Sequence, residues 1–251
     1  MTDKYFADKE EMNEIVSRSN PVVKENVEVI SPEELNQDVV YHIAQDIKTK
    51  LFPNISKRAH KGEDNTLPRV CVAANFFSCW VGFNTTGTIA SKALVETKEA
   101  DEASDHYSSP YKGGYYIHEV PFRVGLKPNK ELVPATSFTD ELWLTTYNQL
   151  TATFPCKVVG LCFIDTVTYT PRTGKLPLET SVIYFEVYPG NSIKLSMNNN
   201  YFKPSDTSPE EISTGFYKCN FDRVNGITLF KEVTRDEFSD AKVKRAAMLS
   251  F

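Results

Sequence analysis

The sequence predicts an α+β fold: an antiparallel β-sheet of about seven strands with three main helices, one N-terminal, one central and one C-terminal. Two observations lead to this prediction. Between residues 69 and 233, most apolar segments are short, rich in aromatic and β-branched side chains, and separated by turn residues, as strands are. Elsewhere, capping residues precede apolar residues at helical spacing. No linker interrupts the β-rich part, so residues 29–251 should form a single domain.

The N-terminal helix is predicted to be long and to lie within residues 31–53. Ser31 and Glu34 have the spacing of a capping box, and Pro32 suits the first helical position because its missing N–H costs no hydrogen bond there. Apolar residues then recur at every fourth position, which gives one apolar stripe along a helix. The stripe consists of Leu35, Val39, Ile43, Ile47 and Leu51.

The part of the chain that follows has the features of strands. Residues 69–83 and 86–96 are expected to pair through a turn, and a polar, acidic loop then leads to a strand at residues 115–125. Pro121 limits the second half of that strand to a sheet edge, because proline donates no hydrogen bond to a neighbouring strand. Further strands are predicted at residues 156–169, 181–190, 192–198, 215–224 and 227–233.

The two remaining helices are predicted from capping residues and apolar spacing. Thr139 is a suitable cap for a central helix over residues 140–153. Thr234 and Glu237 have capping-box spacing at the start of a C-terminal helix over residues 234–249. Acids come early and bases late in that last segment, which suits the helix dipole.

The charge of the chain is unevenly distributed. Residues 1–35 contain nine acids and four bases, a difference of −5 that equals the net charge of the whole chain. The rest of the chain is therefore neutral, and we expect residues 1–28 to form an acidic N-terminal arm. No apolar run approaches the roughly 20 residues that span a bilayer, and the polar N-terminus does not resemble a signal peptide. Five cysteines flanked mostly by apolar residues suggest free thiols and a cytoplasmic, reducing location without membrane contact.

Motifs for common enzyme chemistry are missing from the sequence. There is no metal-ligand spacing of cysteine and histidine, no G-x-S-x-G and no phosphate-binding glycine loop. We therefore expect no metal, no cofactor and no catalytic residues. One pattern is an exception: Glu96 and Lys98 have the E-x-K spacing of the active-site strand of metal-dependent, restriction-type nucleases. That resemblance implies a second carboxylate nearby, and Asp64 is a poor candidate because it falls in a loop.

The leading hypothesis is a non-enzymatic protein that binds single-stranded RNA or DNA. Basic residues cluster at positions 57–61, and a second basic stretch alternates with aromatic residues between positions 111 and 130. Single-strand binders combine such cations, which contact phosphates, with aromatic rings on which bases stack. The predicted phosphate contacts are Lys57, Arg58, Lys61, Lys112, Arg123 and Lys127, and the predicted stacking residues are Tyr115, Tyr116 and Phe122.

An alternative hypothesis is a structural or assembly protein, for example of a virus, that uses the same aromatic sheet to contact protein. An edge strand near Pro121 would suit that function, as would the acidic arm or the C-terminal helix, which could bind a protein partner or a second copy of the chain. A metal-dependent nuclease is the third hypothesis.

Overall fold

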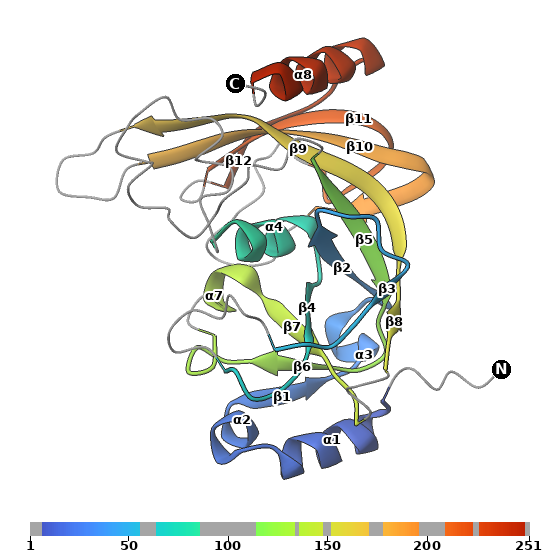
Figure 1. Cartoon of the computed structure of the whole chain (residues 1–251), viewed down its shortest axis with the longest axis vertical. Coiled ribbons are helices and arrows are strands. Elements are labelled where there is room, and N and C mark those ends of the chain that lie inside the picture. Colours follow the sequence, from blue (N-terminus) through green and yellow to red (C-terminus); the bar gives the residue numbers. More distant parts are fainter. Residues whose placement is uncertain are drawn as a thin grey trace. The chain divides into compact units, whose positions relative to one another are not determined.

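The computed structural model describes residues 7–55, 64–85, 114–133, 136–147, 152–170, 178–195, 209–222 and 226–248. In this part of the chain ten strands form one sheet in the order β1-β6-β7-β4-β2-β5-β9-β10-β11-β12, and two short strands, β3 and β8, pair separately (Figure 1). The contacts divide the chain into two compact units. Unit 1 comprises Met1–His42, Ile47–Gly82 and His118–Val158, and unit 2 comprises Ile43–Asp46, Phe83–Ile117 and Val159–Phe251.

Unit 1 combines short helices with short strands. Its helices are α1 (Lys9–Arg18), α2 (Pro21–Glu25), α3 (Pro32–Leu35), α7 (Thr136–Thr139) and most of α4 (Phe76–Thr85). Its strands are β1 (Val27–Ile30), β3 (Lys50–Leu51), β4 (Val70–Ala73), β6 (Gly125–Pro128), β7 (Glu141–Leu144) and β8 (Phe154–Pro155). Strands β2 (Val39–Ala44), β5 (Tyr115–Pro121) and β9 (Lys157–Thr170) have residues in both units.

The predicted fold of about seven strands and three main helices was wrong. The structure is mainly an antiparallel sheet of ten strands, and its helices have between 4 and 14 residues. Among the described helices, none has the length and apolar character needed to cross a membrane.

The long N-terminal helix is the largest of these corrections. Ser31 and Glu34 form the expected capping box, but α3 has only four residues, because Asn36 takes the left-handed conformation that ends helices (φ 55°). The segment then enters β2, where Val40 and Tyr41 are both buried although they point to opposite faces. Burial on both faces requires apolar residues at consecutive positions, and such a run also satisfies a spacing of four.

In two other segments, a predicted strand contains a helix and a predicted helix begins as a strand. Within residues 69–83, only β4 is a strand; Asn75 then accepts a hydrogen bond from the Ser78 N–H (2.9 Å) and caps α4. Conversely, the predicted central helix begins as strand β7, whose neighbours in the sheet are β4 and β6. Both errors concern short apolar runs, for which periodicity does not distinguish a strand from a buried helix. The predicted strand at residues 86–96 lies outside the described residues.

Residues 7–28, most of the predicted acidic arm, contribute buried side chains to a core of unit 1. Helix α1 has a capping box in which Asp8 accepts from the Glu11 N–H and Glu11 accepts from the Asp8 N–H. The acidic residues of this helix are exposed, whereas Met12 and Ile15 are buried against apolar residues from β6 and β7, including Leu126 and Trp143. The negative charge of the segment therefore marks the outer face of a packed helix.

Unit 2 is organised around a meander of long strands and one helix. Strands β9, β10 (Leu178–Lys194), β11 (Glu211–Asp222) and β12 (Gly226–Glu232) pair in sequence order, and α8 (Arg235–Met248) follows. The two strands expected at residues 181–198 are one strand, β10, with an irregularity between Val187 and Ser192. The C-terminal helix is confirmed as α8, and the hydroxyl of Thr234 caps it by accepting from the Glu237 N–H (3.1 Å). Figure 1 shows α8 along one face of the meander.

Candidate functional site

The predicted nucleic-acid contacts fall into three groups in the structure. Lys57, Arg58, Lys61 and Lys112 lie outside the described residues, as do Glu96 and Lys98 of the E-x-K pattern. Arg123 is exposed and Lys127 is half-buried, both in unit 1, and the Lys127 ammonium forms an ion pair with Asp140 (2.8 Å). The aromatic candidates are the third group.

Two of the three predicted stacking residues are core residues. The side chains of Tyr115 and Phe122 are 1% and 2% exposed. Both rings pack among core neighbours, so in this structure neither is open to a base. Tyr116 is half-buried because it points to the opposite face of β5 from Tyr115, and in unit 2 it packs against the cluster that holds Phe163 and Phe238.

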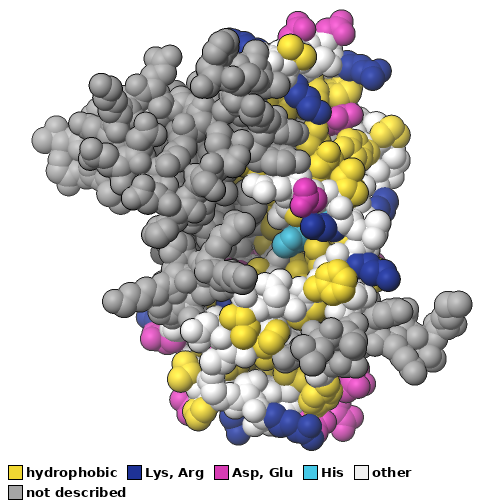
Figure 2. Space-filling view, in the orientation of Figure 1, with side chains coloured by type: hydrophobic (Ala, Val, Ile, Leu, Met, Phe, Trp, Pro, Cys, Tyr) yellow, Lys and Arg dark blue, Asp and Glu magenta, His cyan; other side chains and the backbone are white. Residues whose placement is uncertain are grey.

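One face of the unit 2 sheet carries a row of aromatic and basic side chains. In the register of the sheet, Tyr184 of β10 lies between Phe163 of β9 and Lys218 of β11, and Lys218 lies opposite Lys231 of β12. Residues that are opposite each other in a sheet point to the same face, so these four side chains form one line across four strands. Figure 2 shows basic side chains lying beside hydrophobic ones on the described surface. We call this side of the unit 2 sheet the α8 face.

The aromatic part of the row is covered by Phe238 of α8. Its ring centroid lies 5.3 Å from that of Phe163, 6.3 Å from that of Tyr184 and 5.1 Å from that of Phe216. The first two contacts are edge-to-face, the arrangement that aromatic pairs prefer. Phe238 therefore fills a site lined by rings from three neighbouring strands.

Around Phe238 the aromatic surface is only partly covered. Tyr116, Tyr188 and Phe216 are half-buried and pack against this cluster. Burial raises the pKa of Tyr188 to about 12, and the charges of Glu186 and Tyr116 act in the same direction. The Tyr188 hydroxyl is thus a neutral hydrogen-bond donor at physiological pH, beside rings that solvent can reach.

The two lysines of the row are held by different neighbours. The Lys218 ammonium lies 5.1 Å from the centroid of the Tyr184 ring, and a hydrogen bond to Tyr184 raises the pKa of Lys218. The Lys231 ammonium lies 3.4 Å from the carboxylate of Glu237, which is on α8. Lys218 and Lys231 lie directly opposite each other, and like charges in that position repel. An anion close to the two lysines would therefore be favourable.

The sequence contained a signal for this row that the prediction did not use. The segment 216–220 alternates Phe216, Lys218 and Asn220 with Tyr217 and Cys219, as a strand with two different faces does. Pairing of the strands predicted at residues 215–224 and 227–233 would also have placed Lys218 near Lys231. The contribution of Phe163, Tyr184 and Phe238 to the same face depends on strand order, which the sequence does not show.

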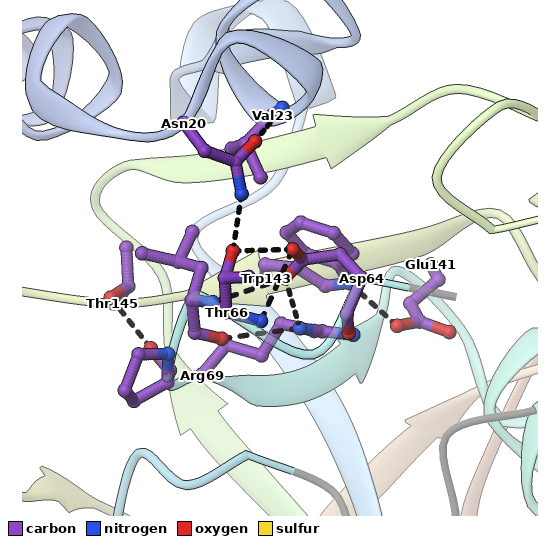
Figure 3. Close-up of polar contacts among 10 residues, drawn as sticks. Asn20, Val23, Asp64, Thr66, Arg69, Glu141, Trp143 and Thr145 are labelled. Atoms are coloured by element: carbon purple, nitrogen blue, oxygen red, sulfur yellow. Dashed lines mark hydrogen bonds and ion pairs between the residues drawn. The ribbon is translucent and has the colours of Figure 1, made fainter. Parts of the chain in front are cut away.

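A buried ionic network in unit 1 has a structural function (Figure 3). Asp64, the poor nuclease candidate, forms an ion pair with Arg69 (2.9 Å) and accepts hydrogen bonds from Thr66 and from the Leu67 N–H. The guanidinium carbon of Arg69 lies 3.9 Å from the centroid of the Trp143 ring. Because this network occupies Asp64 with structural partners, its carboxylate is unsuited to bind a metal ion.

The two described histidines of unit 1, His42 and His118, each contact a backbone group. His42 Nδ1 lies 2.9 Å from the backbone carbonyl oxygen of Cys71, and His118 Nε2 accepts a hydrogen bond from the Lys48 N–H (2.9 Å). Burial raises the pKa of the Cys71 thiol well above its usual range, which disfavours the thiolate that a nucleophile needs. Within the described ranges, no group of three or more His, Cys, Asp or Glu residues could hold a metal ion.

Comparisons with family models, with curated proteins and with solved structures found no match to the chain.

Proposed function

We propose that this protein is a non-enzymatic binding protein that holds single-stranded RNA or DNA on the α8 face of unit 2. The observation that supports the proposal is a line of side chains across four neighbouring strands, in which Lys218 and Lys231 reach the surface while Phe163 and Tyr184 (1% and 4% exposed) are buried beneath Phe238 of α8. Bases stack on aromatic rings with little sequence preference, and lysines neutralise the phosphates between them. The half-buried rings of Tyr116, Tyr188 and Phe216 supply the stacking surface that Tyr115 and Phe122 cannot.

The proposal is tested by fluorescence anisotropy of labelled single-stranded RNA, single-stranded DNA and duplex at two salt concentrations. We expect the single strands to bind more tightly than the duplex and affinity to fall as salt rises. The double variant Lys218→Gln with Lys231→Gln should bind at least about tenfold more weakly, since two phosphate contacts are lost. Lys130→Gln, an exposed lysine of unit 1, is the matched control. Equal loss in the control, or no binding at low salt, contradicts the proposal.

The basic segment at residues 57–61 stays a predicted phosphate contact. Its contribution is measured in the same assay with Lys57→Glu combined with Arg58→Glu. A loss of affinity would assign the segment to the nucleic-acid interface, and unchanged affinity would restrict the interface to unit 2.

A function in assembly is the second candidate, and one observation favours it. Strand β12 is the last strand in the order of the sheet, and Leu229 in its middle is 41% exposed. An exposed edge strand can pair with the same strand of a second copy and extend the sheet. Sedimentation equilibrium of the wild type and of Leu229→Lys tests this function: a dimer that the variant abolishes supports it, and a monomeric wild type contradicts it.

A further inference from the structure

Two consecutive residues of α8 occupy the aromatic and the basic part of the row on the sheet. Phe238 lies between the rings of Phe163, Tyr184 and Phe216, with centroid distances between 5.1 and 6.3 Å. Glu237, the preceding residue, places its carboxylate 3.4 Å from the Lys231 ammonium. One planar ring on an aromatic surface and one anion beside a lysine are also the two contacts that a nucleotide makes with a single-strand binder.

We propose that α8 is an autoinhibitory element, in which Phe238 and Glu237 occupy the places of a base and a phosphate of the bound strand. This inference rests on the proposed function, because it assigns a regulation to the same α8 face. Nucleic acid and α8 then compete for the surface. The apparent affinity of the full chain equals the affinity of the uncovered surface multiplied by the fraction of molecules in which α8 is released.

The attachment of α8 is suited to reversible release. Of the α8 side chains that the structure describes, Phe238 alone is buried, whereas Val243 is 69% exposed. The ion pair between Lys231 and Glu237 is partly exposed to solvent, so its contribution to attachment is small and is screened by salt. Among the side chains of α8 that the structure describes, the Phe238 ring, with Ala241 beside it, makes the contact with the aromatic cluster, and a ligand that supplies other rings could replace it.

The hydrogen bonds that pair β11 with β12 are made by residues that precede α8. Residues 217–222 of β11 bond to β12 through the ladder, and the Val233 N–H donates to the Phe216 carbonyl (2.8 Å) just before the helix begins. The capping residue Thr234 follows. A rotation of the backbone at residues 233–234 could thus move α8 away as a unit, while β12 stays in the sheet.

The test is the anisotropy titration described above, with full-length single variants. Phe238→Ala removes the ring that competes with a base, and we expect about tenfold tighter binding of single-stranded RNA or DNA. Glu237→Gln removes the competing anion without touching the core, and we expect about threefold tighter binding. Asp240→Asn, which removes the same charge from an exposed position of α8, is the matched control and should bind as the wild type does.

Salt dependence provides a readout that a purely structural contact would not change. In the wild type, rising salt also screens the ion pair between Lys231 and Glu237, which competes with the phosphate, and this offsets part of the loss of affinity. Glu237→Gln lacks the offset, so its slope of log affinity against log salt should be steeper than that of the wild type. Asp240→Asn should leave the slope unchanged.

The outcomes separate this inference from the proposed function. Tighter binding by Phe238→Ala and Glu237→Gln, with the steeper slope in Glu237→Gln, supports autoinhibition. If the wild type binds single strands and Glu237→Gln has the same affinity and slope, autoinhibition is overturned while the proposed function stands. If neither the wild type nor any of the variants binds, both are overturned. Glu237→Gln decides the test even if Phe238→Ala fails to fold, because Glu237 is not a core residue.

Discussion

The guanidinium of Arg69 lies 2.9 Å from the carboxylate of Asp64, and both side chains are almost fully buried, with 2% and 4% of their surface exposed. Arg69 also donates hydrogen bonds to the carbonyls of Asp64 and Leu67, and it lies over the Trp143 ring. Trp143 in turn donates to Glu141 (2.6 Å). Arg69, a single buried cation, thus anchors the segment of residues 64–67 in unit 1.

We predict that Arg69→Met destabilises unit 1 by about 3–5 kcal/mol, because the substitution leaves the Asp64 carboxylate buried without its partner. Both tryptophans of the chain, Trp80 and Trp143, belong to unit 1, so their fluorescence during urea unfolding reports on this unit. The control is Arg18→Gln, which removes an exposed ion pair with Glu14 and should cost less than about 1 kcal/mol. Equal effects of the two substitutions would contradict a special contribution of the buried pair.

A second prediction concerns the stability of unit 1 in mild acid. Burial lowers the pKa of His42, and the nearby charge of Lys48 acts in the same direction, while the hydrogen bond with the Cys71 carbonyl opposes them. The native state therefore binds fewer protons than the unfolded chain, whose histidine pKa is about 6.5. The stability from this residue is fully present above that pH and decreases as the pH falls below it.

Urea unfolding of the wild type and of His42→Gln between pH 7.5 and 5, followed by tryptophan fluorescence, checks this prediction. The glutamine can still donate to the Cys71 carbonyl but does not titrate, so its free energy of unfolding should fall less steeply with acid than that of the wild type. Parallel pH profiles would show that His42 does not contribute.

A third prediction concerns the close approach of β9 and β10. A Cβ added at Gly160 would lie 2.5 Å from the Glu186 carbonyl oxygen and 3.1 Å from Ile193 Cδ1. Because the nearest atom belongs to the backbone, Gly160→Ala should force the two strands apart and destabilise unit 2 by about 1–3 kcal/mol. Thermal unfolding followed by circular dichroism measures the effect.

Gly190→Ala provides the comparison for the third prediction. Its backbone is left-handed (φ 74°), but no atom lies within 4 Å of the added Cβ. The expected cost is therefore that of the backbone conformation alone, about 1–2 kcal/mol. If Gly160→Ala has no effect on the melting temperature, the strands approach less closely than the structure indicates.

Several features of the fold could be predicted from local sequence. The cap at Thr234 determined where α8 begins, and the strands of the β-rich C-terminal half lie close to their predicted positions. Ser31 and Glu34 likewise formed the predicted capping box. These features depend on residues within a few positions of one another, so the sequence is sufficient to find them.

Features that depend on tertiary contacts could not be predicted in this way. The apolar residues of β2 and α4 satisfied the wrong periodicity, because burial on several sides removes the alternation that distinguishes strand from helix. Burial also decided which aromatic residues could contact a ligand: Tyr115 and Tyr116 are neighbours in the chain, but successive strand residues point to opposite faces.

The sequence alone determined the chemistry available to this protein: its aromatic and basic residues, its capping residues and its acidic N-terminal segment. Only the tertiary structure decided which of these residues meet. Strand order and register brought Phe163, Tyr184, Lys218 and Lys231 into one line, and the packing of α8 placed Phe238 on it. The physical reason is that pairing between distant strands depends on how the whole sheet buries its apolar surface, which no local pattern records.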